Sequence, residues 1–297
     1  MNQTQDFTKG VIWKQLLFFF FPILIGSFFQ QLYNTVDTII VGQAVGTSAL
    51  AAVGSTGNLT SLIVNFYVGL STGASVVIAQ YYGAQNEKKI HQAVHTSYIL
   101  AIVSGILMML FGLFFSYQCL DAIGTPHDIL NDATLYMQLY FLCMIPGAIY
   151  NIGAGILRAV GDSKRPLYYL IVCSIVNVVF DFIFVVIFHQ GIAGAAIATV
   201  IAQFVCAILV TIQLMRTKAV YKLTLSKMKF HLPVLKKIIM IGAPAGIQST
   251  MYSISNIVLQ SHINAFGTQT IASWAVYVKI DALFWMMIAA IGAAITT

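Results

Sequence analysis

Apolar runs of about 20 residues recur along nearly the whole chain, and they limit the fold more than any single motif. A helix needs about 20 apolar residues to cross roughly 30 Å of hydrocarbon. Eight such runs have the approximate bounds 13–41, 56–81, 92–116, 130–156, 167–188, 192–215, 235–263 and 271–295. The chain is 59% hydrophobic and only 8% charged, which is too apolar for a water-soluble protein. We therefore predict an all-α polytopic membrane protein, because the runs are too long and uniform for barrel strands.

Lysine and arginine collect in alternate connections between these runs. They lie before the first run, after the second and the fourth, and between the sixth and the seventh, which places 14 of the 15 on one side of the membrane. The connection after the third run holds Asp121 and Asp128 instead. By the positive-inside rule, the N-terminus and the basic connections are predicted to be cytoplasmic. The net charge of +6 is then an orientation signal, and no nucleic-acid partner is expected.

A weak internal repeat indicates how the runs are grouped. Placing Pro244 on Pro22 aligns five identical residues in fifteen positions at an offset of about 222 residues, which contains six runs. An even number of spans returns the second copy to the same orientation, as in transporters built from parallel repeats. The predicted units are a six-helix lobe at 1–215, a basic linker at 216–234 and the first two helices of a second lobe at 235–297. The second lobe is expected to be incomplete, so the chain is interpreted as a truncated one.

The basic linker and the cysteines carry no further chemistry in this interpretation. The linker is expected to be solvated, with contact to anionic lipid headgroups as the alternative. The four cysteines lack the paired spacing of a metal or redox site and are interpreted as small apolar residues. They are Cys119, Cys143, Cys173 and Cys206. The first run continues into a polar-striped helix, so it is predicted to be a retained span and not a signal peptide.

Polar residues inside the first run mark a candidate site. Gln30, Asn34 and Asp37 have the i, i+4, i+7 spacing that places side chains in one row on a helix. A carboxylate within a membrane span is costly unless it has a partner, a proton or a cation. The fifth run offers such a partner, because Asn177 and Asp181 lie one helical turn apart.

The depth of these residues in the membrane is similar. Asp37, Asp181 and Thr199 each lie about eight residues from the predicted outer surface, roughly 12 Å deep. Tyr136 and Tyr140 bracket the same level. Together they predict a site where a proton or Na⁺ neutralises two carboxylates and thereby changes which helix packing is favoured. The alternative is that the two acids only hydrogen-bond across helices as packing contacts.

Several motifs together resemble the multidrug and toxic compound extrusion (MATE) family of transporters, especially the branch that includes the DNA-damage-inducible F proteins. The motifs are Tyr33 to Thr38, Ala79 to Ala84, Arg158 to Asp162 with Lys164 to Pro166, and Asn177 to Asp181. The resemblance implies a twelve-helix, two-lobed antiporter that exports cationic or amphipathic organic compounds in exchange for H⁺ or Na⁺. It also implies a multi-pass protein of a prokaryotic plasma membrane that is a monomer when complete, needs no cofactor and is not an enzyme.

The resemblance also assigns roles to residues. It implies a coupling site at Asp37, Asn177, Asp181 and Thr199, with Tyr136 as a further member and Na⁺ bound at the first three. The repeat places Leu259 opposite Asp37, so coupling is expected in the first lobe alone. The residues interpreted as lining a substrate cavity are Gln30, Asn34, Tyr140, Asn256 and Asp281.

Two alternatives to the exporter stay open. A flippase for lipid-linked saccharides belongs to the same superfamily, but it should have a cationic cavity, and the first six runs contain no clear interior lysine or arginine. An inactive fragment is the second alternative. A membrane-embedded enzyme is not supported, because no nucleophile, metal-protease or paired-carboxylate hydrolase motif is present.

Overall fold

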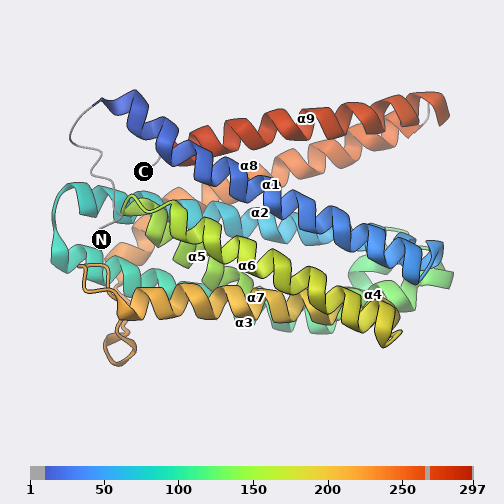
Figure 1. Cartoon of the computed structure of the whole chain (residues 1–297), viewed down its shortest axis with the longest axis horizontal. Coiled ribbons are helices and arrows are strands. Elements are labelled where there is room, and N and C mark those ends of the chain that lie inside the picture. The colour runs from blue at the N-terminus through green and yellow to red at the C-terminus, as the bar shows by residue number, and fades with distance from the viewer. Residues whose placement is uncertain (1–10, 265–267, 296–297) are drawn as a thin grey trace.

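The computed structural model describes residues 11–264 and 268–295, and these residues form a bundle of long helices (Figure 1). The helices are α1 (Ile12–Ala44), α2 (Thr47–Gly83), α3 (Glu87–Ala122), α4 (His127–Phe141), α5 (Met144–Ala159), α6 (Lys164–Asp181), η1 (Phe182–Ile187), α7 (Gly191–Arg216), η2 (Leu225–Lys227), α8 (Leu232–Asn264) and α9 (Thr268–Ile295). Over these ranges the chain contains no β-strand. The predicted all-α fold is confirmed.

The first six predicted spans are present in the structure. Five helices are long and apolar enough to cross a membrane, and α4 with α5 forms a sixth if the bent pair is one span. The seventh and eighth predicted spans correspond to α8 and α9. Among the described residues, neither contains an apolar stretch of span length, although α9 has a shorter one at Ile280–Ile295. The structure therefore supports six of the eight predicted spans.

The fourth predicted span is broken in its middle. Helices α4 and α5 meet at an angle of 45°. The break lies at Leu142 and Cys143, whose amides donate to the carbonyls of Leu139 and Tyr140, three residues back. Pro146 follows at the start of α5, and a proline there removes the amide that would bond to the carbonyl of Leu142 and crowds that carbonyl. Pro146 thus accounts for the bend, whereas α1 and α8 continue through Pro22 and Pro244.

The basic connections lie together at one end of the bundle, as the alternation of lysine and arginine predicts (Figure 1). This end also carries the linker between α7 and α8. The backbone amide of Thr224 donates to Nε2 of His95 at 3.0 Å, and the amide of His231 donates to the Thr96 hydroxyl at 3.2 Å. The linker is therefore fixed to the beginning of α3.

The interior of that linker differs from the expected solvated segment. Tyr221 and Leu223 are 2% and 1% exposed and belong to the hydrophobic core. The amide of Leu223 donates to the carbonyl of Leu214 at 2.9 Å, which folds the linker back onto α7. Two buried apolar side chains outweigh the polarity of the surrounding lysines, because burial stabilises each of them by about 1.5–3 kcal/mol.

Helices α2 and α8 approach each other so closely that their backbones touch. A Cβ atom added at Gly69 would lie 2.3 Å from Cα of Gly246, and one added at Gly73 would lie 2.6 Å from Cα of Gly242. Gly69 and Gly73 are four residues apart on α2, and Gly242 and Gly246 are four residues apart on α8. This spacing of small residues lets membrane helices pack closely. We call these four residues the glycine seam.

Helix α5 is enclosed by its neighbours α2, α3 and α7. Its small residues permit this packing, since a Cβ at Gly153 would meet Val210 of α7 at 2.7 Å and one at Gly155 would meet Ser71 of α2 at 2.8 Å. The Ser71 hydroxyl also donates to the carbonyl of Asn151 at 2.7 Å. Polar side chains of α5 that turn away from these contacts face the space between α1, α6 and α7.

Candidate functional site

Two acidic side chains meet where α1 packs against α6. Asp37 lies in the last third of α1, and Asp181 is the final residue of α6. Asp181 is fully buried, and Asp37 is partly buried. Their carboxyl groups are close enough to interact electrostatically. After Asp181 the backbone widens into the π-helix η1, and such π segments often occur at functional sites.

These acids and the adjacent amide present oxygen atoms without hydrogen-bond donors in the described part of the chain. The atoms are Oδ1 of Asp37, Oδ1 of Asn177 and both carboxyl oxygens of Asp181, and all are buried. A buried acceptor without a donor is destabilising. The set can be satisfied by a proton on a carboxyl group or by a hard cation, which prefers oxygen ligands.

Thr199 links the acidic residues to α7. Its hydroxyl donates to the carbonyl of Ala195 at 3.1 Å, and its oxygen accepts from Nδ2 of Asn177 at 3.4 Å. Asn177 is 1% exposed, one helical turn before Asp181. This bond turns the amide nitrogen toward Thr199 and leaves Oδ1 of Asn177 free. Tyr136 is buried and interacts electrostatically with both Asp37 and Asp181. The structure therefore brings together all five residues predicted for the coupling site, which are Asp37, Tyr136, Asn177, Asp181 and Thr199.

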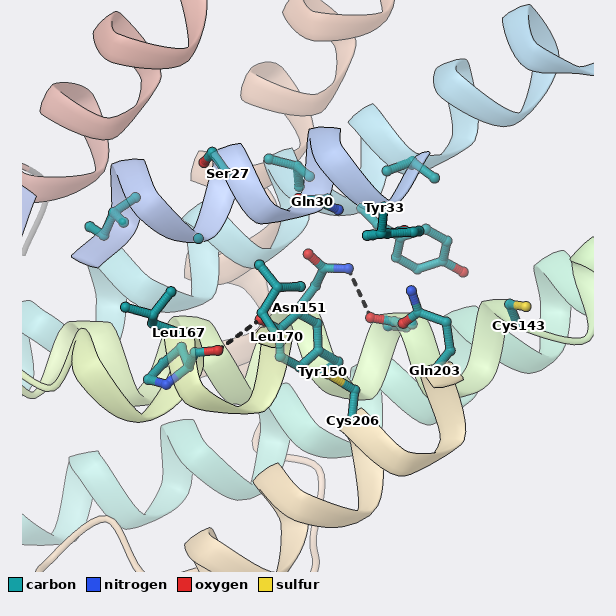
Figure 2. Close-up of a pocket in the computed structure, with 18 of the residues that line it drawn as sticks. Ser27, Gln30, Tyr33, Cys143, Tyr150, Asn151, Leu167, Leu170, Gln203 and Cys206 are labelled. Atoms are coloured by element: carbon teal, nitrogen blue, oxygen red, sulfur yellow. Dashed lines mark hydrogen bonds between the residues drawn. The ribbon is translucent and has the colours of Figure 1, made fainter. Parts of the chain in front are cut away.

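A cavity of ≈ 180 Å³ lies beside this cluster. Its lining comes from α1, α2, α4, α5, α6, α7 and two residues between these helices, Cys143 and Ser163. The lining residues include Gln30, Tyr33, Tyr67, Tyr140, Cys143, Tyr150, Asn151, Arg158, Ser163, Pro166, Leu167, Leu170, Thr199, Gln203 and Cys206. Figure 2 shows Gln30 and Tyr33 of α1 on one side, facing Asn151 and Gln203 on the other.

The cavity wall is polar and partly fixed by hydrogen bonds. The Tyr150 hydroxyl donates to the carbonyl of Pro166 at 3.3 Å, and Nδ2 of Asn151 donates to the carbonyl of Gly147 at 2.8 Å. Oε1 of Gln203 is buried without a donor within the described residues. A pocket with aromatic walls and a few convergent polar groups is the usual form of a small-molecule site.

The cavity and the acidic cluster share a wall. Thr199 lines the cavity and is hydrogen-bonded to Asn177. Tyr33 and Tyr140 also line it and interact electrostatically with Asp37. The rings of Tyr140 and Tyr136 stack with their centroids 6.2 Å apart. A change of charge at the two acids therefore acts directly on side chains that line the cavity.

Comparison with known proteins assigns this arrangement to a family. The family model MatE matches residues 22–183, which is more than half of the chain and contains the α1 and α6 acids. The chain belongs to the MatE family.

Similar MatE relatives are longer than this chain. The probable multidrug resistance protein YoeA of Bacillus subtilis is 28% identical over 302 residues, and the alignment covers 99% of this chain and 65% of YoeA. The multidrug export protein MepA of Staphylococcus saprophyticus is 20% identical, with 94% of this chain and 62% of MepA covered. The chain thus spans less than two thirds of the length of these relatives.

Solved structures confirm the fold. A MATE family transporter of the MOP superfamily in an outward-facing conformation has a TM-score of 0.91 and 26% identity, and the match covers 99% of this chain and 65% of that one. A crystal structure of MATE in the bent conformation has a TM-score of 0.88 and 27% identity, and covers 95% of this chain and 63% of that one. This chain is therefore a multi-pass membrane protein with the MatE fold.

Three residues predicted for a substrate cavity lie elsewhere in this MatE chain. Asn34 is exposed on α1, Asn256 is exposed on α8, and Asp281 is half-buried on α9. None of them lines the cavity, whereas Gln30 and Tyr140 do. Gln30 and Asn34 do lie on one face of α1, as their i, i+4 spacing predicts. The helices that pack against α1 cover only part of this face, so Gln30 lines the cavity while Asn34 stays exposed.

The sequence-based interpretation missed Arg158 and Gln203, which both line the cavity. From the sequence, Arg158 contributes to the orientation signal and to a family motif, but not to the predicted cavity. The statement that the first six spans lack an interior lysine or arginine is wrong, because α5 reaches Ala159 and its last turn places Arg158 at the cavity. The spacing of Asn151 and Arg158, and of Thr199 and Gln203, on single helix faces could have revealed both.

Proposed function

We propose that the protein is a secondary active antiporter that exports cationic or amphipathic organic compounds in exchange for H⁺ or Na⁺. The observation that carries this proposal is the position of the cavity beside the acid pair. Thr199 lines the cavity and accepts a hydrogen bond from Asn177, one helical turn before Asp181, and the cavity-lining Tyr33 and Tyr140 lie within the electrostatic influence of Asp37. Membership of the MatE family supports the transport activity, since relatives carry the names multidrug export and multidrug resistance protein. The working protein is proposed to be a monomer without a cofactor.

The coupling follows from charge neutralisation. Asp37 and Asp181 cannot both stay ionised and buried at low cost, so one binds a proton or both share Na⁺. Asn177 supplies a further free oxygen for the cation, and no third acidic, histidine or cysteine ligand joins the cluster within the described residues. Losing the ion restores the repulsion between the carboxylates and favours another packing of α1 on α6. Tyr33, which belongs to α1 and lines the cavity, then moves with α1, and this movement changes the affinity of the cavity for the substrate.

The orientation belongs to the same proposal. The end of the bundle that carries the basic connections is proposed to face the cytoplasm of a prokaryote, together with the N-terminus. The acid pair lies toward the opposite end of α1 and α6, so it is proposed to exchange ions with the outer medium in one state of the cycle. Coupling to the inward ion gradient then expels the substrate.

The first test removes one carboxylate charge without changing its shape. In Asp37→Asn and Asp181→Asn variants, efflux of ethidium driven by an imposed pH or Na⁺ gradient is expected to fall by about tenfold or more, because a coupling free energy is lost. Ethidium fluorescence in energised cells, with Na⁺ and pH gradients imposed separately, measures the loss and identifies the ion.

The matched control is Asp121→Asn, an exposed acid at the end of α3. It should retain efflux, and all three variants should reach the membrane at equal levels. Undiminished efflux from Asp181→Asn would show that the pair is a packing contact, which is the alternative interpretation of these residues.

A second candidate function gains one observation from the structure. A flippase for lipid-linked saccharides needs a cationic cavity, and Arg158 places one positive charge in the cavity wall. Movement of a fluorescent lipid-linked pyrophosphate across vesicles containing the protein, without any effect of ion gradients, would favour the flippase over the antiporter.

A further inference from the structure

We propose that Arg158 forms a subsite for the carboxylate of a compact aromatic substrate, so that within the proposed substrate class the cavity binds amphipathic compounds with a carboxylate most tightly. This inference rests on the proposed function, because it names the chemical class that the same cavity takes. Within the proposed class of cationic or amphipathic compounds, it assigns the tighter binding to amphipathic compounds that carry a carboxylate.

The positive charge of Arg158 has no acidic partner in the described part of the chain. Its side chain is half-buried in the last turn of α5 and lines the cavity. A guanidinium group stays charged at every pH that a protein tolerates. The ion pair that the described residues form at this end joins Arg165 to Asp162, with Nη1 and Oδ2 3.1 Å apart. Asp162 also accepts from the backbone amide of Arg165 at 3.1 Å.

Because Asp162, the nearest acid in the sequence, is paired with Arg165, the guanidinium of Arg158 can bind an anionic ligand. A half-buried cation gains most from a group that both neutralises it and accepts two parallel N–H bonds, and a carboxylate does both. Ser163 also lines the cavity and carries a hydroxyl donor. The Tyr150 hydroxyl donates to the carbonyl of Pro166, and within the described residues no hydrogen bond joins it to Arg158.

The remainder of the cavity suits an aromatic body. Tyr33, Tyr67 and Tyr140 line it, together with apolar atoms of Leu167 and Leu170. An apolar cavity of about 150 Å³ holds benzene, and the cavity here measures ≈ 180 Å³. A ligand with one or two rings and an acidic group fills this space, with the acid at Arg158 and the rings against the tyrosines.

A lipid phosphate shares the anionic chemistry that Arg158 recognises. The volume favours the carboxylate, because a phospholipid that placed its phosphate at Arg158 would also have to place its glycerol and two acyl chains. The test therefore includes a measurement that distinguishes a lipid phosphate from the carboxylate of a substrate.

The test compares three probes of nearly equal shape on the purified full chain in phosphatidylcholine nanodiscs. The probes are 1-naphthoate, its neutral amide 1-naphthamide and the cation 1-naphthylmethylamine, with binding measured by calorimetry. Naphthoate is expected to bind about tenfold more tightly than the amide, and the amine more weakly than either. In Arg158→Gln this preference is expected to vanish, through weaker naphthoate binding with unchanged amide binding.

The matched control is Lys164→Gln, which removes an equal charge from an exposed position six residues away that does not line the cavity. It should keep the preference for naphthoate, since a general charge effect would weaken it there too. Equal binding of naphthoate and naphthamide to the unaltered protein overturns the proposal even if Arg158→Gln fails to fold. A preference that survives in Arg158→Gln overturns it as well.

Repeating the titration in nanodiscs that contain phosphatidylglycerol separates the lipid source. If anionic lipid abolishes naphthoate binding to the unaltered protein by competition, the subsite belongs to lipid phosphate and the proposal is overturned. Binding is measured without any ion gradient. A preference for naphthoate in a protein that shows ion-driven efflux of neither ethidium nor naphthoate would therefore refute the antiporter and retain the subsite. Ion-driven efflux of ethidium without any preference for naphthoate would refute the subsite alone.

Discussion

Thr199 has two contacts that join the ion site to the cavity. Its oxygen accepts from Asn177, and its side chain lines the cavity wall. Without this acceptor, the amide nitrogen of Asn177 would lose its partner within the described residues. The hydroxyl therefore fixes which end of the Asn177 amide faces the two acids.

Thr199→Val keeps the shape of the side chain and removes the hydroxyl. We expect a loss of about 1 kcal/mol in the free energy of unfolding, because a buried donor loses its partner. We also expect a several-fold weaker dependence of efflux on the driving ion, since the freed amide can rotate its nitrogen toward the acids. Thermal unfolding and efflux at graded ion concentrations measure the two effects.

Thr199→Ser is the control, because serine keeps the hydroxyl. It should behave as the unaltered protein does in both measurements. If valine and serine give the same ion dependence, Thr199 has no part in the coupling and the contact to Asn177 is structural only.

The candidate ion site could be inferred from the sequence because acids within apolar runs are costly and their depth can be counted. That reasoning located Asp37 and Asp181 in neighbouring helices, which the structure brings together. It could not locate Arg158, because an arginine at the end of a run satisfies the rule for cytoplasmic loops equally well. The structure shows that α5 continues to Ala159, and this places Arg158 in the helix and not in a cytoplasmic loop.

At the scale of the helices, the glycine seam makes a sharp stability prediction. Gly73→Ala should destabilise the protein, because the added Cβ would lie 2.5 Å from the carbonyl oxygen of Ile238 and 2.6 Å from Cα of Gly242. Backbone atoms cannot yield as a flexible side chain can, so α8 must shift away from α2. Thermal unfolding in detergent, followed by tryptophan fluorescence, should show a lower midpoint.

The control lies on the same helix. Gly57 also belongs to α2, and a Cβ added there would have no neighbour within 4 Å. Gly57→Ala should leave the midpoint unchanged or raise it, since alanine favours a helix over glycine by about 1 kcal/mol. Equal stability of the two variants would contradict the close packing of α2 on α8.

The helices themselves were largely predictable, and their contacts were not. Seven of the eight apolar runs each coincide with a helix and the fourth coincides with the bent pair α4 and α5, because length and hydropathy are local properties of the sequence. The bend before Pro146 could not be predicted from the proline alone, since Pro22 and Pro244 lie in helices that continue. The glycine seam was missed, because a glycine four residues from another marks close packing only when the partner helix is known.

At the scale of the whole molecule, the basic end of the bundle predicts its orientation. In a Cys119→Ser background, Asp128→Cys at the start of α4 should react with a membrane-impermeant maleimide on intact cells. Lys88→Cys, in the first turn of α3, should react only after the membrane is permeabilised. The remaining native cysteines are buried, so they should contribute little labelling. The opposite labelling pattern would reverse the proposed orientation of the ion site.

The proposed division into 1–215, 216–234 and 235–297 is a prediction about the whole molecule. Helix α8 lies along α2, and α9 lies against α1 (Figure 1). The linker is anchored to α3. Residues on both sides of the predicted boundary thus share extensive contacts.

The glycine seam has a consequence for how this bundle can change shape. Where two backbones touch without intervening side chains, no rotamer change can absorb a sliding or tilting movement, so α2 and α8 must travel as one rigid body. A conformational cycle would then have to displace other helices around this fixed pair. The α4–α5 bend is one place where such a displacement would break no α-helical hydrogen bond, since the backbone there is already interrupted.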